Sequence, residues 1–300
     1  MKLLNLKKKS KSDIIFEAII VVFLICLFIV TFYPFWYVFI VSVNDPIDSM
    51  RGGISLLPRS FTLSSYAAIL KDNDFVRSIG VSVARVVIGT PLAVLFTAML
   101  AFVLSKKELV GYKFWRKIFV FTMYFGGGTI PTYMVYRTLG LIDSFWVYII
   151  PSLVGVYNMI LINSFINGLP KELEESAKID GANDLTVFFR IVLPLSKPII
   201  ATVTLFVAIG HWNSFFDSYL YTTSQNLKTL QAVMMNILNQ YQTANLEASS
   251  VAASAVQNKA TSSDSIRMAA TMISTIPIIM LYPFVQKYFV KGMMIGAVKG

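Results

Sequence analysis

Residues 171–198 read KELEESAKIDGANDLTVFFRIVLPLSKP and lie between two long apolar runs. The start of this stretch is acidic, and acidic side chains stabilise the N-terminal end of a helix. The acidic residues are Glu172, Glu174 and Glu175. We predict a first helix that begins near Pro170 and stops at Asp180-Gly181, because proline suits a first turn and glycine can adopt a positive φ.

A second helix is predicted to follow, capped by Asn183 or Asp184 and ended by Leu193-Pro194. Its apolar side chains recur at spacings of three and four residues, as in an amphipathic helix. They are Leu185, Phe188, Phe189 and Val192. A helix lying on lipid would explain this second half, but anionic lipid would repel the acidic first half. A protein partner explains both halves.

The whole chain is too apolar for a water-soluble domain of its length. Of its 300 residues, 56% are hydrophobic and 14% are charged, whereas soluble domains have about 25% charged residues. Several apolar runs approach the length of a membrane span, which predicts an all-α integral membrane protein in contact with membrane lipid. The net charge of +10 does not require a nucleic acid partner, because cytoplasmic loops of membrane proteins accumulate Lys and Arg.

Six apolar runs can each cross ~30 Å of hydrocarbon as a helix. They are Ile14–Val41, Ile79–Leu104, Ile118–Tyr136, Phe145–Ile166, Pro198–Leu220 and Met268–Val290. Gly126, Gly127, Gly128 and Pro131 interrupt the third run. The first run is interpreted as a retained span because it is too long for a signal peptide. Its Cys26 is expected to be a buried thiol rather than a lipoprotein cleavage site.

Lysine and arginine predict the orientation of the chain. Seventeen lie in or beside the two tails, loop 105–117 and loop 168–197, and seven lie in the segments on the other side. The positive-inside rule therefore places both termini and the opening stretch in the cytoplasm. The expected organisation is a basic cytoplasmic tail (1–13), a single six-span domain (14–300), a cytoplasmic loop between spans four and five (168–197), and outer loops (44–76 and 223–267).

The second outer loop is predicted to begin with an amphipathic helix over residues 230–241, where apolar side chains recur at helical spacing. The small, polar segment ASSVAASAVQNKATSSDS (248–265) follows it. This segment is either a flexible connector or a loop that touches something outside the cell.

The opening stretch resembles the EAA motif of permease subunits of bacterial ATP-binding cassette importers. That motif is Glu-Ala-Ala, three residues, Gly, nine residues, Ile, one residue, Leu-Pro. Here Glu175-Ser176-Ala177 precedes Gly181, Ile191 and Leu193-Pro194 at the same spacings, with Ser176 in place of the middle alanine.

Other segments extend the resemblance, which covers most of the chain from about Phe75 onward and, more loosely, the first span. The sequence PFVQKYFVKGMMIGAVKG resembles the tail of maltose-type permeases. The sequences FGGGTIPTYMVYRTLGLIDSFWVYIIP and GHWNSFFDSYLY resemble the subgroup that imports complex or uronate-containing oligosaccharides.

The resemblance implies a non-catalytic subunit of the bacterial cell membrane that translocates an oligosaccharide by alternating access. The implied partners are a second homologous permease, a dimer of ATP-binding subunits that carries ATP and Mg, and an extracellular solute-binding (lipo)protein. In that family the motif forms a coupling helix that sits in a cleft of the ATPase. The expected coupling residues are Glu172, Glu175, Ser176, Ala177, Asp180, Gly181, Ala182, Phe188, Leu193 and Pro194.

The residue inventory agrees with a chain that holds no cofactor. None of the 16 glycines precedes a lysine, so the phosphate-binding loop of ATPases is absent from the sequence. With one histidine and one cysteine, a metal cluster is not expected.

Polar and aromatic side chains within the predicted spans are candidates for a substrate pathway, because polar groups in a membrane are costly. They are Tyr124, Tyr157, Asn158, Asn163, His211, Trp212, Asn213 and Asp217. Each also has an ordinary alternative, since Asn bonds between helices and Tyr and Trp favour membrane interfaces. Arg85, inside span two, either joins the pathway or extends outward to the interface.

Two other functions stay open at this point. A secondary transporter driven by an ion gradient often has internal repeats and intramembrane carboxylates; no repeat is evident, and Asp217 is the main candidate carboxylate. A membrane-embedded enzyme or assembly scaffold is the second alternative. The presence or absence of a nucleotide-binding subunit in a purified complex separates this alternative from an ATP-driven importer.

Overall fold

The computed structural model describes residues 11–49, 51–248 and 264–280. Within these residues the regular structure is helical, apart from one isolated bridge between Asn44 and Phe61. The all-α prediction is therefore confirmed for the described chain. The chain divides into two compact units, residues 1–69 with 240–273, and residues 70–239 with 274–300.

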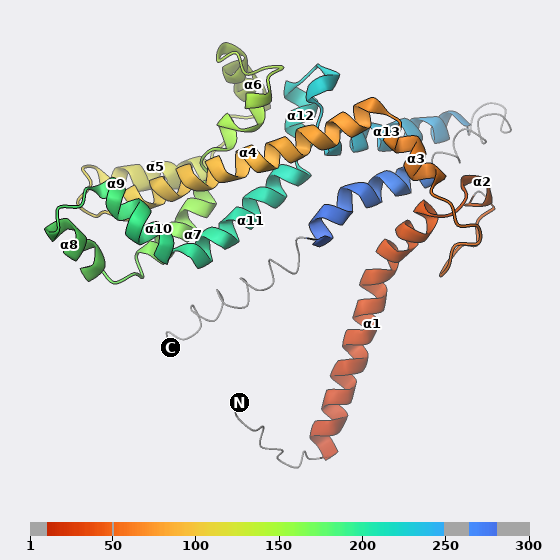
Figure 1. Ribbon diagram of the computed structural model, residues 1–300, viewed down its shortest axis with the longest axis horizontal. Helices are drawn as coiled ribbons and strands as arrows, with labels where there is room; N and C mark the ends of the chain where they lie inside the picture. The colour runs from red at the N-terminus through yellow and green to blue at the C-terminus, as the bar shows by residue number, and fades with distance from the viewer. Residues whose placement is uncertain (1–10, 50, 249–263, 281–300) are drawn as a thin grey trace. The chain divides into compact units, whose positions relative to one another are not determined.

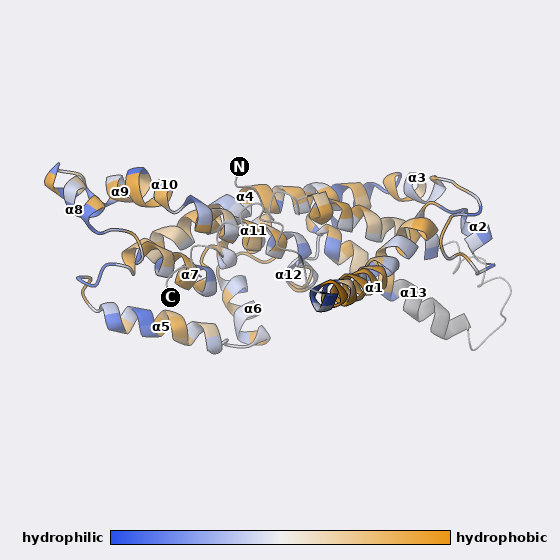
Figure 2. Ribbon diagram, turned by 90° about the horizontal axis from the view of Figure 1, so that it is seen from below, coloured by the Kyte–Doolittle hydropathy of each residue, from blue (hydrophilic) through white to orange (hydrophobic). Residues whose placement is uncertain are grey.

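The first unit is built on α1 (Lys11–Ser42), followed by α2 (Pro46–Ser49) and α3 (Ser64–Leu70). Helix α1 is apolar on all sides, as its colour in Figure 2 shows, and most of its side chains are exposed within this chain. Such a helix needs lipid or another protein around it. Cys26 is exposed on α1, so the prediction of a buried thiol is wrong for this chain taken alone.

The loop that follows α1 is ordered by one buried amide. The Asn44 side-chain oxygen accepts hydrogen bonds from the backbone N–H groups of Arg59 (2.8 Å) and Ser60 (2.9 Å). Its amide nitrogen donates to Asp48 at 3.0 Å, and Arg59 pairs with the same carboxylate at 3.0 Å. The hydrogen bonds that the Asn44 amide and the Arg59 guanidinium donate to Asp48 lower the pKa of this carboxyl. The predicted loop is therefore a compact structure rather than a loose connection.

The second unit contains most of the remaining helices (Figure 1). They are α4 (Asn73–Val103), α5 (Tyr112–Tyr124), α6 (Thr129–Thr138), α7 (Val156–Ile166), α8 (Glu172–Ile179), α9 (Asp184–Val187), α10 (Leu193–Leu195), α11 (Lys197–Asn213) and α12 (Phe216–Tyr221). Two 3-10 segments, Phe145–Tyr148 and Ile150–Ser152, precede α7, and a third, Gln225–Leu227, follows α12. Helix α13 (Leu230–Ala248) and a helix over 264–280 contribute residues to both units.

Helix α4 is the centre of the second unit and packs against α11 and α7. Its buried side chains are mostly small, and small residues let helix backbones approach closely in membranes. The small buried residues are Ser78, Ser82, Gly89, Thr90, Ala93, Thr97, Ala98 and Ala101. Asp72 caps the helix by accepting from the N–H of Asp74 at 2.9 Å, which is the usual role of aspartate at a helix start.

The predicted spans are found as helices, but three of them are broken. Two described helices, α1 and α4, are long and apolar enough to cross a membrane, and three bent helix pairs raise the number to five at most. The third predicted span is α5 followed by α6 at 116°, with the predicted break at Gly126–Gly128. The fourth bends by 42° before α7. The sixth span lies partly outside the described residues, since its helix is described over 264–280.

The fifth predicted span, Pro198–Leu220, needs a correction, because it is not one helix. Helix α11 ends at Asn213, and Ser214 takes an extended conformation (ψ 126°) before α12 begins at Phe216. The Asp217 carboxylate accepts from the Ser214 hydroxyl at 3.0 Å and from the N–H of Ser218 at 2.8 Å. Side-chain bonds of this kind compete with the helical ladder and favour turns.

Segment 223–267, which the sequence predicts to be an outer loop, contains the expected helix near its start. Helix α13 covers Leu230–Ala248, which confirms the amphipathic helix and extends it beyond residue 241. Leu230, Ala232 and Met234 are buried along it. Most of the polar segment 248–265 lies outside the described residues, and so do the first ten residues and the C-terminal tail.

The contact between Gly89 on α4 and His211 on α11 gives a test of this packing. A methyl group at Gly89 would lie 2.9 Å from the His211 Nε2 atom, so Gly89→Ala is expected to force the helices apart. Overpacking of this kind costs about 1–3 kcal/mol, and the thermal unfolding midpoint in detergent should fall.

Gly80→Ala is the matched control on the same helix, because nothing lies within 4 Å of a methyl group there. Alanine in a helix is about 1 kcal/mol better than glycine, so this variant should be as stable as the parent or more so. Equal midpoints for the two variants would contradict the close approach of α4 and α11.

Candidate functional site

The opening stretch forms a bent helical unit, α8 to α10 (residues 172–195), which we call the elbow (Figure 1). Its first helix, α8, ends at Ile179; Asp180 is its C-cap, and Gly181 follows with φ +83°. The Ala182 N–H donates to the Ala177 carbonyl at 2.9 Å, and the Gly181 N–H donates to the Lys178 carbonyl at 3.0 Å. This pair of bonds is the Schellman motif, which satisfies the last carbonyls of a helix and needs a left-handed residue. The predicted stop at Gly181 is confirmed.

The second half of the elbow starts where the sequence predicts and ends slightly later. The Asn183 side chain accepts from the Thr186 N–H at 2.8 Å and caps α9. The helix then widens into a π-helical turn over Phe188–Val192, in which the Leu193 N–H reaches the Phe188 carbonyl. Proline has no N–H, so Pro194 cannot close a normal turn, yet the helix continues to Leu195 before an 85° bend into α11.

The apolar face of the second half is divided between the core and the surface. Phe188 is 2% exposed and Val192 1%, and both belong to the core that α4, α7 and α11 form. Phe189 and Leu185 are 46% and 59% exposed. The prediction that this whole face enters a partner is therefore corrected: Phe188 and Val192 anchor the elbow to its own chain, while Leu185 and Phe189 stay accessible.

The other expected coupling residues lie mostly on the surface. The exposed ones are Glu172, Glu175, Ser176, Asp180, Gly181 and Pro194. Ala177, Ala182 and Leu193 are half-buried and pack against the core cluster. Leu173 and Ile179 add exposed apolar area at 44% and 86%. The elbow therefore exposes acidic and apolar side chains together, while the buried side chains of Phe188 and Val192 hold it against the core.

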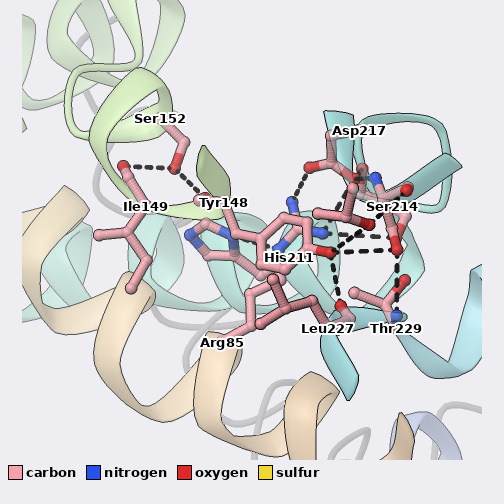
Figure 3. Close-up of polar contacts among 11 residues, drawn as sticks. Arg85, Tyr148, Ile149, Ser152, His211, Ser214, Asp217, Leu227 and Thr229 are labelled. Carbon is pink, nitrogen blue, oxygen red and sulfur yellow. Dashed lines mark hydrogen bonds and ion pairs between the residues drawn. The ribbon is translucent and has the colours of Figure 1, made fainter. Parts of the chain in front are cut away.

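A second group of polar residues lies between α4, α11 and α12 (Figure 3). Arg85 is 3% exposed, and its guanidinium forms an ion pair with Asp217 through both terminal nitrogens, one of them at 3.1 Å. The Arg85 Nε–H donates to His211 Nδ1 at 3.2 Å. One expectation was that Arg85 would extend outward to the interface, and this is not the case. Arg85 is held inside by His211 and Asp217, two residues that the sequence analysis listed as pathway candidates without pairing them with Arg85.

Tyr148 covers this group and connects it to the next loop. The Arg85 guanidinium carbon lies 4.8 Å from the centre of the Tyr148 ring, a distance at which a cation is attracted to an aromatic face. The Tyr148 hydroxyl donates to the Leu227 carbonyl at 2.6 Å. Lys228 donates to the carbonyls of Ser218 (3.1 Å) and Thr222 (2.5 Å). The result is a connected polar network in which the buried Nε2 atom of His211 has no hydrogen-bond partner.

The remaining pathway candidates are not gathered with this group. Asn163 is buried and donates to the Ala101 carbonyl of α4 at 2.8 Å, which is a bond between helices. Trp212 donates to the Ser274 carbonyl at 2.9 Å, and Asn213 is exposed. Tyr124 and Tyr157 are 78% and 57% exposed, and Asn158 is half-buried beside Gly155.

The sequence reading did not identify Tyr148 or Lys228, and it did not pair Arg85 with Asp217. One signal was available for the pair: each is a charge within a predicted span, and opposite charges in a membrane favour pairing. No local pattern marks Tyr148, because its role depends on residues 70 or more positions away.

The divided apolar face predicts different results for two adjacent phenylalanines. Phe188→Ala should cost about 3–5 kcal/mol, since it empties a buried position, and should lower the thermal unfolding midpoint. Phe189→Ala, the matched control, removes a half-exposed ring and should leave the midpoint nearly unchanged. A larger loss for Phe189→Ala would mean that the faces are assigned the wrong way round.

The ion pair of Arg85 and Asp217 gives a second stability test. Removing one partner of a buried pair costs about 3–5 kcal/mol, so Arg85→Met should lower the unfolding midpoint strongly. Asp217→Asn in the Arg85→Met background should cost much less than it does alone.

Arg77→Met is the control for this test, because Arg77 lies on the same helix and pairs at 3.4 Å with Asp74, but both side chains are about half exposed. Surface pairs contribute about 0–1 kcal/mol. Additive effects of the Arg85 and Asp217 changes would argue against a coupled pair.

Comparisons with known proteins identify a family and several relatives of this chain. Residues 60–295 match the family model described as "Binding-protein-dependent transport system inner membrane component". Protein LplC of Bacillus subtilis (strain 168) is 38% identical over 97% of this chain and 97% of its own length. A polygalacturonan/rhamnogalacturonan transport system permease protein, YtcP, from the same organism is 36% identical over 95% of this chain and 99% of its own length.

A solved structure is similar as well. It is a bacterial ABC transporter involved in the import of the acidic polysaccharide alginate, and one of its chains superposes with a TM-score of 0.84 at 30% identity, over 94% of this chain and 99% of that chain. Because the family model matches residues 60–295 and relatives of 30% identity or more cover nearly the whole sequence, the chain belongs to the family of inner-membrane permease components of binding-protein-dependent ABC transport systems.

Proposed function

We propose that this permease passes an oligosaccharide across the membrane, and that ATP hydrolysis in a partner dimer drives the passage through the elbow. The observation that carries the proposal is the elbow itself: acidic and apolar side chains are exposed on a bent unit whose buried half is part of the core. A rigid unit with an accessible apolar surface suits docking into a groove of another protein.

The connection from the elbow to α11 supports a mechanical role. Only Ser196 separates α10 from α11, and Ser196 is 1% exposed. A partner that moves the elbow would therefore displace the start of α11 directly. Movement of helices around a central site is the general logic of alternating access in transporters. ATP and Mg would be bound by the partner, and this chain would hold no cofactor.

The proposed orientation places the elbow and both termini in the cytoplasm, with six spans in all. The charge distribution supports this, because the basic residues concentrate in or beside the tails and the two loops assigned to the cytoplasm. The proposed complex contains a second homologous permease, two ATP-binding subunits and an extracellular solute-binding protein. Tyr124, Tyr157, Asn158, Trp212 and Asn213 remain candidates for the pathway wall.

The proposed cargo is an oligosaccharide that contains uronic acid. Two relatives support this class by their names, since one is a polygalacturonan/rhamnogalacturonan permease and another imports alginate, an acidic polysaccharide. Galacturonate and alginate residues share a sugar ring with a carboxylate. Trigalacturonate is therefore a suitable probe, and maltotriose is a neutral sugar of the same length for comparison.

The test reconstitutes the permease pair, the ATPase dimer and the binding protein in proteoliposomes and measures uptake of labelled trigalacturonate together with ATPase rate. Gly181→Val forces a side chain into a left-handed conformation (φ +83°), although nothing lies within 4 Å. The strain is about 1–2 kcal/mol. We expect uptake to fall at least tenfold, because the bend of the elbow and its fit to the partner depend on this residue.

Gly140→Val is the matched control, because Gly140 also has a positive φ (+67°) and open space around it but lies after α6, outside the elbow. It should cost similar stability and leave uptake within about twofold, the usual size of an effect away from the mechanism. Unchanged uptake in Gly181→Val, or uptake driven by a proton gradient without ATP, would overturn the proposed function.

A further inference from the structure

The elbow is attached to α4 by an ion pair that its motif does not include. The Lys106 ammonium, three residues beyond the end of α4, donates to the Glu174 carboxylate on α8. The two side chains are 23% and 22% exposed, so the pair is largely withdrawn from solvent. On the same helix, Glu172 and Glu175 are exposed. Three acidic residues that look equivalent in the sequence therefore point to different surroundings.

Lys106 is also held by the aromatic core. Its ammonium lies 4.4 Å from the centre of the Phe102 ring, within the range of a cation–π contact. Phe102 is 5% exposed, and its ring centre lies 5.4 Å from that of Phe188 in the second half of the elbow. A continuous set of contacts thus runs from α8 through Lys106 and Phe102 to Phe188. Both halves of the elbow meet the same end of α4.

The charged groups around Lys106 determine what the loss of this ion pair would do. Burial lowers the pKa of Lys106 from its usual value, and the nearby cations Lys178 and Lys171 act in the same direction. Glu174 is the carboxylate that directly contacts this basic group. Asp184 and Glu108 act on the Lys106 pKa in the opposite direction, and Lys178 pairs with Asp184 at 3.4 Å. Without the charge of Glu174, Lys106 would lose the carboxylate that contacts it, while Ala177 would still pack against the core. Loss of the pair should therefore loosen α8 without unfolding it.

We propose that Lys106 and Glu174 are positioning residues that fasten α8 to the end of α4, so that movement of the elbow reaches α4 as well as α11. The proposal rests on the proposed function, because it assumes that a partner moves the elbow. It assigns Glu174 to a contact within the chain and leaves Glu172 and Glu175 for the partner. The elbow then moves two helices: α11 through the backbone and α4 through the Lys106–Glu174 pair.

The test compares Lys106→Met, Glu174→Gln and the double variant in the reconstituted complex. Three quantities are measured: trigalacturonate uptake, the ATPase kcat and KM, and retention of the ATPase subunits on the purified permease. Each single variant should lower uptake per ATP hydrolysed about fivefold, a typical size for a coupling interaction. The KM for ATP and the retention of the ATPase should stay unchanged. Because one link is removed in each case, the double variant should resemble either single variant.

Lys107→Met is the matched control, since it removes the same charge as Lys106→Met at an exposed neighbouring position. Lys107→Met should leave uptake per ATP unchanged. Multiplying effects in the double variant, or loss of the ATPase from Glu174→Gln, would overturn the proposal, because Glu174 would then act apart from Lys106 or contact the partner itself. Unchanged coupling in both single variants would overturn it as well.

The Gly181→Val variant in the same preparation separates this proposal from the function on which it rests. If Gly181→Val abolishes uptake and the Lys106 and Glu174 variants do not reduce coupling, the elbow drives transport without the link. If Gly181→Val also leaves uptake unchanged, the proposed function itself is wrong.

Discussion

The close packing of α4 against α11 and α7 is the constraint on which the second unit depends. Lipid is as apolar as a leucine side chain, so helices in a membrane associate through shape and hydrogen bonds rather than through the hydrophobic effect. The small residues of α4 provide the shape, and Gly89 leaves room for the His211 ring. Asn163 and Thr97 add bonds to backbone carbonyls of neighbouring segments at 2.8 and 3.3 Å. The elbow and the buried arginine are positioned by these contacts.

Features with a local cause were predictable from the sequence. Gly181 ends α8, Asn183 caps α9, and Gly126–Gly128 separate α5 from α6, because each depends on the backbone preferences of a few adjacent residues. Features with a distant cause were not. The helical spacing in the second half of the elbow assigned Phe188 and Phe189 to the same apolar face. Contact with the core around α4 is what buries Phe188 and not Phe189. Likewise, Arg85 and Asp217 are 132 positions apart, and no sequence pattern joins them.

At the end of the elbow, Pro194 has the expected effect on hydrogen bonding but does not end the helix where the sequence predicts. Pro194 removes one backbone donor, which predicts a helix end. The chain instead inserts a π turn at Phe188–Val192, in which Leu193 bonds five residues back, and places proline at the start of the next turn, where it is tolerated. Burial of Phe188 and Val192 offsets the irregular backbone. The 85° bend into α11 follows only after Leu195, so the elbow extends beyond the predicted end at Pro194.

Two ion pairs join α4 and the residues just beyond its end to other helices, and their spacing determines how movement can spread along α4. Arg85 joins α4 to α12 within the network that Tyr148 covers, and Lys106 joins its other end to α8. A buried pair contributes little net stability but penalises every arrangement in which one partner is left alone, so each fixes a position. Pro91 lies between them and removes one helical donor. Helices bend most readily at such a point, and the segment from Val94 to Phe102 that packs on the elbow lies wholly on one side of it. Movement of α4 at the end near Lys106 can therefore reach Arg85 along this helix only through the turn at Pro91, which lacks one hydrogen bond.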